Sequence, residues 1–269
     1  MSAAPRATVE RFAMLHGGDT PLLMPNAFDA GSAKVLADLG FEALATTSSG
    51  FAATLGRLDG SVTRDETLAH SAAIAAVVDV PVSGDLENAF ADDPDDVAVT
   101  IRLAVDSGVA GCSVEDYARD RDEIYDAALA RERVAAAVEA AAGRIVLTAR
   151  AENHIHGRTD LADTIARLQS FQDAGADVLF APGVSAADDI RAIVTSVDRP
   201  VNVLALPGTP AVAELAGLGV GRVSVGGALI WVALTAVVDA ATGLREHGTY
   251  EYWQQLGPGR DAARRAFGS

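Results

Sequence analysis

Two acids that directly follow an apolar stretch are the first residues whose chemistry stands out. Residues 80–83 read as a short buried strand, and Gly84, Asp85, Leu86 and Glu87 come next. Side chains alternate along a strand, so Asp85 and Glu87 are expected on the same face. Burying two carboxylates is costly unless something compensates their charge. A divalent cation is the simplest compensation, so the pair predicts a metal site.

Polar residues also follow or lie within other apolar stretches. They are Ser48, Ser49, Gly50, Asp59, Glu115, Arg150, Glu152 and Asn202. The carboxylates suit Mg²⁺, which needs few direct protein ligands and keeps several waters; Mn²⁺ is the second candidate. The planar guanidinium of Arg150 matches a carboxylate or phosphate, and the 48–50 segment can offer N–H groups and hydroxyls to an anionic oxygen.

The elements that must position these residues alternate between strand and helix. Strands are expected at 22–27, 41–47, 80–83, 110–114, 144–149, 177–180, 200–205 and 222–225. A helix pattern follows each one, the first capped by Asp29 and stopped by Gly40. This predicts a single (β/α)8 TIM-type barrel over 1–269 with a C-terminal helical tail; an open doubly wound sheet is the alternative. In such barrels, chemistry lies where strands run into the following loops. The polar segment 117–125 is expected to be a mobile loop.

Composition excludes several classes of function. The 269 residues carry 37 acids and 21 bases, a formal charge of −16, which disfavours nucleic acid and anionic membranes. The single cysteine, Cys112, allows no disulfide within the chain, and no signal peptide is recognisable, so a cytoplasmic location is expected. Residues 223–244 contain only one charge, Asp239, but Gly226-Gly227 interrupts them. We expect a strand and a buried helix there rather than a membrane span.

The ordered motifs resemble those of a known family. They are Thr47-Ser48-Ser49-Gly50, Leu58-Asp59-Gly60, Gly84-Asp85-Leu86-Glu87-Asn88, Ser113-Val114-Glu115-Asp116 and Thr148-Ala149-Arg150. From about residue 22 to 244, this set is similar to the isocitrate lyase / phosphoenolpyruvate mutase superfamily. The resemblance implies a barrel that binds Mg²⁺ and small anionic 2-oxo acids or their enol forms. It also implies a homotetramer, a dimer of dimers that exchanges the eighth helix between subunits.

The resemblance gives roles to individual residues. It implies that Asp85 is the direct metal ligand and that Asp59, Glu87 and Glu115 hold the waters of the metal, Glu87 standing where an aspartate is more usual. Substrate would contact Asp59 and, for its carboxylate and oxo oxygen, the segment Ser48, Ser49 and Gly50. Arg150 would contact the substrate as well, and Asn202 is a weaker match. Arg150, Glu115 and Tyr117 are the predicted catalytic residues.

Departures from the family pattern narrow the predicted reaction. The lyases carry a cysteine motif in the loop after the fourth strand, but residues 117–123 contain no cysteine. Cys112 lies three residues before Glu115, so it should face away from the metal. The lysine and asparagine that the mutases use in this loop are also absent. The sequence therefore predicts a Mg²⁺-dependent carbon–carbon lyase, such as an oxaloacetate decarboxylase, working through an enolate.

Two alternatives remain open from the sequence. One is an enzyme of the phosphoenolpyruvate or phosphonopyruvate type, and the other is a non-catalytic protein that binds 2-oxo acids. The proton donor is also open, with Tyr117, Tyr125, His154 and a metal-bound water as candidates. His154 and His156 are expected to have a role in the loop rather than to bind a metal, because the usual further ligands are missing.

Overall fold

The computed structural model describes residues 3–268, and a barrel of eight parallel strands forms its centre. The sheet runs in the order β1-β10-β9-β8-β7-β4-β3-β2, and every strand pair is parallel. A bridge between Asn26 and Ala45 joins the two outer strands and closes the barrel. The predicted (β/α)8 barrel is confirmed. Its strands are β1 (Leu22–Met24), β2 (Leu44–Ala45), β3 (Val82–Asp85), β4 (Gly111–Glu115), β7 (Val146–Arg150), β8 (Val178–Phe180), β9 (Val201–Leu204) and β10 (Arg222–Ser224).

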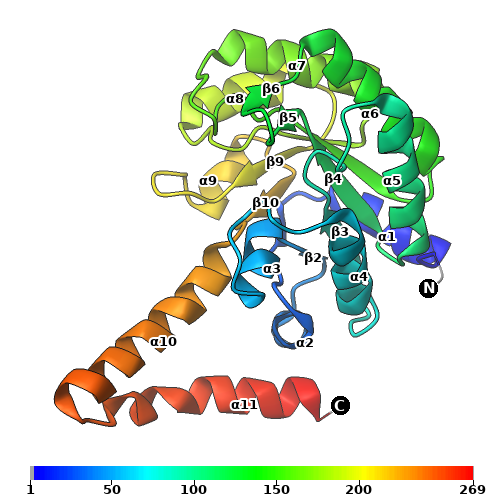
Figure 1. Ribbon diagram of the computed structural model, residues 1–269. Helices are drawn as coiled ribbons and strands as arrows, with labels where there is room; N and C mark the ends of the chain where they lie inside the picture. Colours follow the sequence, from blue (N-terminus) through cyan, green and yellow to red (C-terminus); the bar gives the residue numbers. More distant parts are fainter. Residues whose placement is uncertain (1–2, 269) are drawn as a thin grey trace.

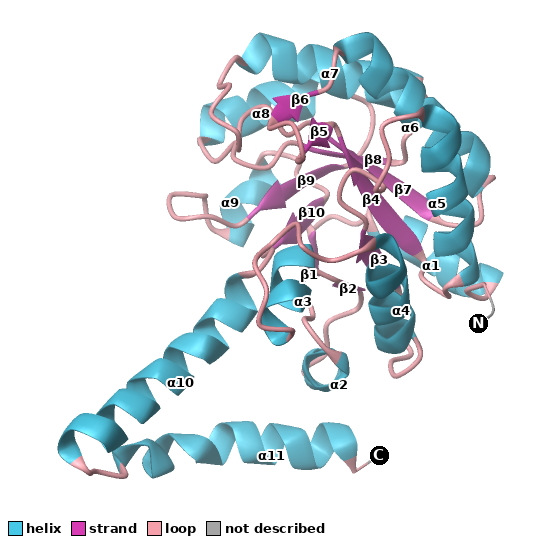
Figure 2. Ribbon diagram, in the orientation of Figure 1, coloured by secondary structure: helices cyan, strands magenta, loops and turns pink. Residues whose placement is uncertain are grey.

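Helices follow the strands and surround most of the barrel (Figures 1 and 2). Asp29 caps the first of them with a capping box, as the sequence predicts. Asp93, with Pro94 after it, and Asp160 cap two others by accepting hydrogen bonds from backbone N–H groups of the first turn. The helices are α2 (Ala30–Asp38), α3 (Ser48–Thr54), α4 (Arg64–Ala75), α5 (Pro94–Asp106), α6 (Ala127–Ala141), α7 (Leu161–Asp173), α8 (Ala187–Ser196), α9 (Val212–Gly217) and α10 (Ala228–His247).

A helix that the sequence patterns did not indicate, α1 (Arg6–Leu15), packs at the amino-terminal end of the barrel. Its Phe12 is fully buried in one apolar cluster with Leu22 and Val146, the first residues of β1 and β7. A Cβ on Gly111 would lie 2.6 Å from the Phe12 ring, so only glycine allows this approach. Because α1 fills the amino-terminal end, the barrel opens at the carboxyl ends of its strands.

The structure corrects the expected length of one strand and the expected form of one loop. The strand expected at 41–47 is only β2, because Thr47 leaves it to cap α3 through a hydrogen bond from Gly50 N–H. The segment expected to be a mobile loop forms a hairpin of β5 (Tyr117–Ala118) and β6 (Glu123–Ile124). Tyr117 and Tyr125 are buried. These aromatic side chains anchor a segment whose many charged residues had suggested exposure to solvent.

The helix expected to be buried, α10, is exposed instead. Among its side chains only Ile230 is buried, whereas Val232 and Val237 are each more than 60% exposed. Figure 1 shows α10 leaving the barrel as an arm. The chain returns through η1 (Glu251–Gln255) and α11 (Leu256–Phe267), which packs on α2 with Arg265 Nε 3.1 Å from Asp38 Oδ2.

By length and composition alone, α10 could cross a membrane, and only 6% of its apolar window is buried within the chain. The strand–helix division expected for 223–244 is confirmed by β10 and α10. The error about burial has a physical cause. An apolar helix signals that its surface needs a partner, but its composition does not say whether that partner belongs to the same chain.

Candidate active site

A cavity of about 290 Å³ opens at the carboxyl ends of the barrel strands. Residues at or just after the ends of all eight strands contribute to its wall. The predicted site residues in the wall are Ser48, Ser49, Asp59, Asp85, Glu115, Arg150 and Asn202. Gly50, Glu87 and Tyr117 are not part of it. The barrel therefore brings together most of the predicted residues from five different strands and the segments that follow them.

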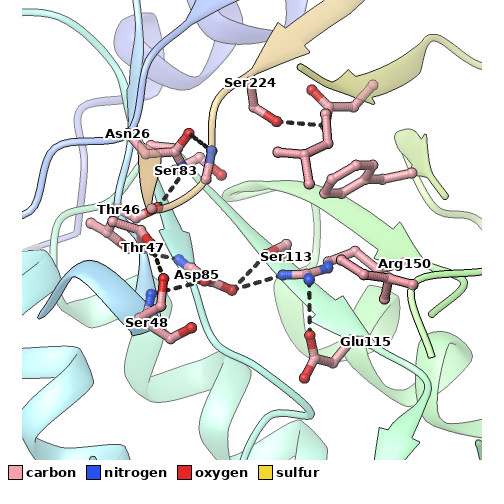
Figure 3. Close-up of a pocket in the computed structure, with 18 of the residues that line it drawn as sticks. Asn26, Thr46, Thr47, Ser48, Ser83, Asp85, Ser113, Glu115, Arg150 and Ser224 are labelled. Carbon is pink, nitrogen blue, oxygen red and sulfur yellow. Dashed lines mark hydrogen bonds and ion pairs between the residues drawn. The ribbon is translucent and has the colours of Figure 1, made fainter. Parts of the chain in front are cut away.

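The carboxylate of Asp85, the last residue of β3, lies at the centre of this group (Figure 3). Its Oδ2 accepts a hydrogen bond from the backbone N–H of Ser48 at 3.0 Å. Its Oδ1 accepts from Arg150 Nη1 at 3.0 Å and from Ser113 Oγ at 3.4 Å. The Asp85 N–H in turn donates to Thr46 Oγ1 at 2.8 Å. Groups from β4, from β7 and from the segment after β2 thus fix the orientation of this carboxylate.

Arg150, the last residue of β7, contacts three carboxylates with one guanidinium. Besides Asp85, Nη2 lies 3.1 Å from Glu115 Oε2, and Nε donates to Glu152 Oε1 at 2.8 Å. Glu115 and Glu152 are buried, and burial raises the pKa of Glu115 well above its usual value although Arg150 opposes the shift. The network therefore holds more negative charge than one guanidinium can neutralise.

Glu87 does not share a strand face with Asp85, contrary to the sequence expectation. Strand β3 ends at Asp85, and Glu87 has a left-handed backbone with φ of 50°. Strand alternation therefore no longer applies to it. Its carboxylate lies 3.3 Å from Arg119 Nε, and Arg119 Nη2 lies 3.2 Å from Asp59 Oδ2. Burial and the neighbouring Asp85 raise the pKa of Glu87 to about 7.

The turn after β3 is conformationally strained. Glu87, Ala89 and Phe90 all have positive φ, which is rare for residues other than glycine. Arg133 of α6, only 1% exposed, holds this turn by donating to the carbonyls of Asn88 at 2.6 Å, Asp92 at 3.0 Å and Ala91. Its guanidinium also lies 4.0 Å from the centroid of the Tyr125 ring. Sequence reasoning missed Arg133, since nothing in α6 sets it apart from an exposed arginine.

The residues present fit a divalent cation. Five carboxylates, Asp59, Asp85, Glu87, Glu115 and Glu152, share two guanidiniums, Arg119 and Arg150. Glu87 Oε1 is buried without a hydrogen-bond partner. No three His, Cys, Asp or Glu side chains within residues 3–268 form a ready-made metal cage. Mg²⁺ does not require one, because it is commonly held by one or two carboxylates and water.

The segment 48–50 does not offer the free N–H groups that the sequence led us to expect. Ser48 and Ser49 begin α3 and line the cavity, but the N–H of Gly50 already donates to Thr47 Oγ1 at 3.3 Å. The N–H of Ser48 is likewise engaged by Asp85. The Ser49 hydroxyl also lies 3.1 Å from Thr47 Oγ1, so the groups of this segment are largely engaged with one another and with Asp85.

The floor of the cavity is built around Arg222, a residue that sequence reasoning missed. This buried guanidinium donates to Asn202 Oδ1 at 2.8 Å and to Thr148 Oγ1 at 3.1 Å, and Nη1 lies 3.1 Å from His16 Nε2. Asn202 in turn donates to Ser224 Oγ at 2.9 Å. An available signal was the spacing of Arg222 and Ser224, which places two polar side chains on one face of an apolar strand.

The candidate proton donors differ in whether their side chains reach the cavity. Tyr117 points its hydroxyl to Asp122 at 2.7 Å, and that hydrogen bond raises the pKa of Tyr117. Tyr125 donates to Asp92 at 2.5 Å, and His154 is not in the wall. Cys112 is fully buried, and burial raises the pKa of its thiol to about 12. His156, in contrast, lines the cavity.

The fold and the acidic cavity define a barrel enzyme whose chemistry lies at the carboxyl ends of the strands. A family model described as phosphoenolpyruvate phosphomutase matches residues 12–245. The chain belongs to this family, within the phosphoenolpyruvate mutase / isocitrate lyase superfamily of carbon–carbon lyases and mutases. The prediction of a lyase-type enzyme is confirmed at this level.

Proteins of similar sequence agree with this family assignment. An uncharacterised protein of Mycobacterium tuberculosis is 33% identical over 229 residues, which are 84% of this chain and 86% of that protein. Oxaloacetate decarboxylase 2 of Pseudomonas fluorescens is 28% identical over 225 residues, 80% of this chain and 75% of its own.

Solved structures share the fold over almost the whole chain. A candidate lyase or mutase from Burkholderia cenocepacia is 48% identical with a TM-score of 0.94, covering 98% of this chain and 97% of that one. Phosphonopyruvate hydrolase, crystallised with oxalate and Mg²⁺, is 22% identical with a TM-score of 0.85, covering 100% of this chain and 95% of its own. At that identity the second likeness shows the fold alone.

Proposed function

We propose that the protein is a Mg²⁺-dependent carbon–carbon lyase that cleaves a small 2-oxo dicarboxylic acid, with oxaloacetate the first substrate to test. The observation that carries the proposal is the Asp85–Arg150 pair at the centre of a cavity with surplus carboxylates. Among the described residues of the wall there is no cysteine and no lysine. This favours a reaction whose bond cleavage needs no protein acid, as in decarboxylation of a 2-oxo acid.

The metal and the substrate would be bound by residues whose positions the barrel already fixes. Asp85 would hold the metal directly, and Asp59, Glu87 and Glu115 would hold its waters, since carboxylate oxygens have lone pairs left beyond their present hydrogen bonds. When bound, Mg²⁺ would polarise the 2-oxo group and stabilise negative charge on it. Phosphonopyruvate hydrolase, crystallised with oxalate and Mg²⁺, supports this choice of ion within the shared fold.

Arg150 has a position suited to orient the substrate. Its guanidinium is held by Glu115 and Glu152 on two sides and lies in the cavity wall. Five N–H donors leave it able to bind a substrate carboxylate while keeping an existing partner. The hydroxyls of Ser48 and Ser49 would accept or donate hydrogen bonds at the opposite side of Asp85.

The proposed cleavage breaks the bond between carbons 3 and 4 of the substrate. The electron pair of that bond moves toward the 2-oxo oxygen, CO₂ leaves, and an enolate remains. A proton added at carbon 3 then gives the keto product. The low-dielectric cavity strengthens each charge interaction that stabilises the enolate.

The test is to follow CO₂ and pyruvate formation from oxaloacetate with Mg²⁺, with Mn²⁺ and with EDTA, above the uncatalysed background. We expect turnover that EDTA abolishes and either metal restores. Metal-independent turnover, or none with any small 2-oxo dicarboxylate, would contradict the proposal. A parallel phosphorus NMR assay with phosphonopyruvate tests the alternative chemistry, and calorimetry with oxalate and Mg²⁺ identifies a protein that binds 2-oxo acids without turning them over.

A further inference from the structure

His156 is a titratable residue in the cavity wall to which neither metal binding nor substrate orientation gives a role. It lies on the turn that follows β7, after Arg150 and Glu152. Its ring stacks on that of Tyr117, with centroids 3.6 Å apart and an interplanar angle of 18°. Its Nε2 lies 3.9 Å from Glu152 Oε2. The imidazole is therefore held between the hairpin and a buried carboxylate.

The backbone around His156 holds the ring in place. Its N–H donates to the carbonyl of Glu152 at 3.2 Å, and the N–H of Arg158 donates to the carbonyl of Asn153 at 2.8 Å. The turn also packs closely on Gly183, where a Cβ would lie 2.8 Å from the backbone nitrogen of Ile155. A group that must transfer a proton at a defined atom needs this kind of fixed position.

The other polar groups in the wall are weak acids, permanent cations or carboxylates that already have a role. Arginines remain charged in proteins, and serine or threonine hydroxyls are weak acids. The carboxylates of Asp85, Glu115 and Glu152 are each within 3.1 Å of Arg150, and the proposed function already assigns them to holding the metal, its waters or Arg150. Among the described wall residues, no other side chain is an imidazole, a thiol or a phenol. Histidine is also the side chain whose charge changes near neutral pH.

We propose that His156 is the proton donor that converts the enolate into the keto product, an inference that rests on the proposed lyase function. The electron pair of the enolate forms a new bond between carbon 3 and the imidazolium proton. The N–H bond of the imidazolium breaks, the neutral ring remains, and water later returns the proton. The product is then released in its keto form rather than as an enol.

The surroundings of His156 suit this cycle. Glu152 favours the imidazolium, whereas Arg119 and Arg150 oppose it, and Asp122 and Tyr117 lie on the hairpin side. Burial lowers the pKa of His156, which makes its imidazolium a stronger acid. Glu152 would thus help the ring to take up the proton, and burial would help it to give the proton up.

The first experiment compares His156→Gln with His154→Gln, a matched control two residues away whose side chain does not line the cavity. With oxaloacetate and Mg²⁺, CO₂ release and keto-pyruvate formation are measured separately. In His156→Gln we expect keto-pyruvate formation in the active site to fall by about 10²–10⁴-fold, with enolpyruvate released wherever cleavage continues. Unchanged formation of the keto product in step with CO₂ would overturn the inference. His154→Gln should match the wild type.

Two further measurements separate a chemical role of His156 from misfolding of the variant and from failure of the proposed reaction. Imidazole added to His156→Ala should restore keto-pyruvate formation if the loss is chemical. The NMR signals of the His156 ring should shift when oxalate and Mg²⁺ bind, and those of His154 should stay unchanged. No response of His156 would overturn the inference even if the wild type decarboxylates oxaloacetate. A clear response in a protein without turnover would instead contradict the lyase function alone.

Discussion

Arg150 Nη1 lies 3.0 Å from Asp85 Oδ1, so the last residue of β7 and the last residue of β3 meet at the barrel mouth, one on each side of β4. Sixty-five positions separate them in the chain. Both side chains are only 16% exposed, which strengthens their interaction over that of a surface pair. The ion pair therefore holds two groups together in the cavity: a central carboxylate and a guanidinium able to bind an anion.

Replacing Asp85 with asparagine keeps the shape of the side chain but removes its charge. Changing groups outside the metal's own ligands typically weakens metal affinity by 10–100-fold, so losing a direct ligand should weaken Mg²⁺ binding by more than about 100-fold. Calorimetry measures this without any assay of turnover. Asp95→Asn, in the exposed first turn of α5, is the control and should bind Mg²⁺ as the wild type does. Equal affinity in both variants would remove Asp85 from the metal site.

Arg133→Met should destabilise the protein through the strained turn that carries Glu87. The change removes the hydrogen bonds that the buried Arg133 donates to the partly buried carbonyls of Asn88, Ala91 and Asp92. With hydrogen bonds from charged groups contributing about 1.5–3 kcal/mol when buried and less when partly exposed, we expect a loss of about 3 kcal/mol in the free energy of unfolding. Urea denaturation measures it.

The neighbouring Arg131→Met is the matched control, because Arg131 is exposed on the same helix. Its free energy of unfolding should change by less than about 0.5 kcal/mol. Similar losses in the two variants would mean that helix α6 responds to any loss of arginine. In that case the hydrogen bonds of Arg133 would not be the cause.

His16 should make the protein less stable in mild acid. Burial, followed by the nearby Arg222, lowers the pKa of His16 from 6.5 to about 3. Between these values the unfolded chain binds the proton more tightly than the folded protein does. The stability is therefore complete above pH 6.5 and is lost as the pH falls toward 3.

At pH 4.5 the loss from His16 should be about 2–3 kcal/mol, from the two pKa units below 6.5. Urea unfolding of the wild type and His16→Gln between pH 7 and 4.5 measures it as the difference between their slopes. His247→Gln, an exposed histidine at the end of α10, controls for general effects of acid. Parallel slopes for the wild type and His16→Gln would mean that His16 does not titrate as described.

The exposed apolar face of α10 should mediate assembly, as the resemblance to helix-exchanging tetramers implies. Val237 and Val238 are 61% and 60% exposed in the single chain. Burying a charge in a subunit interface is costly, so Val237→Asp should dissociate the assembly. Light scattering after size exclusion should give a tetramer for the wild type and smaller species for the variant. Asp239→Asn on the same helix should remain tetrameric, and a monomeric wild type would refute the proposed assembly.

The sequence by itself determined the barrel and much of the site. Alternating apolar strands and capped helices, seen at Asp29 and Asp160, are local patterns, so they can be read without the fold. Residues at strand ends, such as Asp85, Glu115 and Arg150, could be expected to converge because parallel strands of a barrel end at one face. These predictions depend only on periodicity and on the general geometry of the fold.

Only the tertiary structure decided which side chains meet. Glu87 leaves the predicted face because its backbone turns left-handed after β3, and Gly50 uses its N–H to begin α3. Arg133 acquires its role from carbonyls 41 to 45 positions away, and Arg222 from partners 20 to 206 positions away. His156 acquires its position from Tyr117 of the hairpin. Such contacts depend on packing between distant elements, which local sequence patterns do not encode. The exposure of α10 is a further case, since its composition could not say where its partner lies.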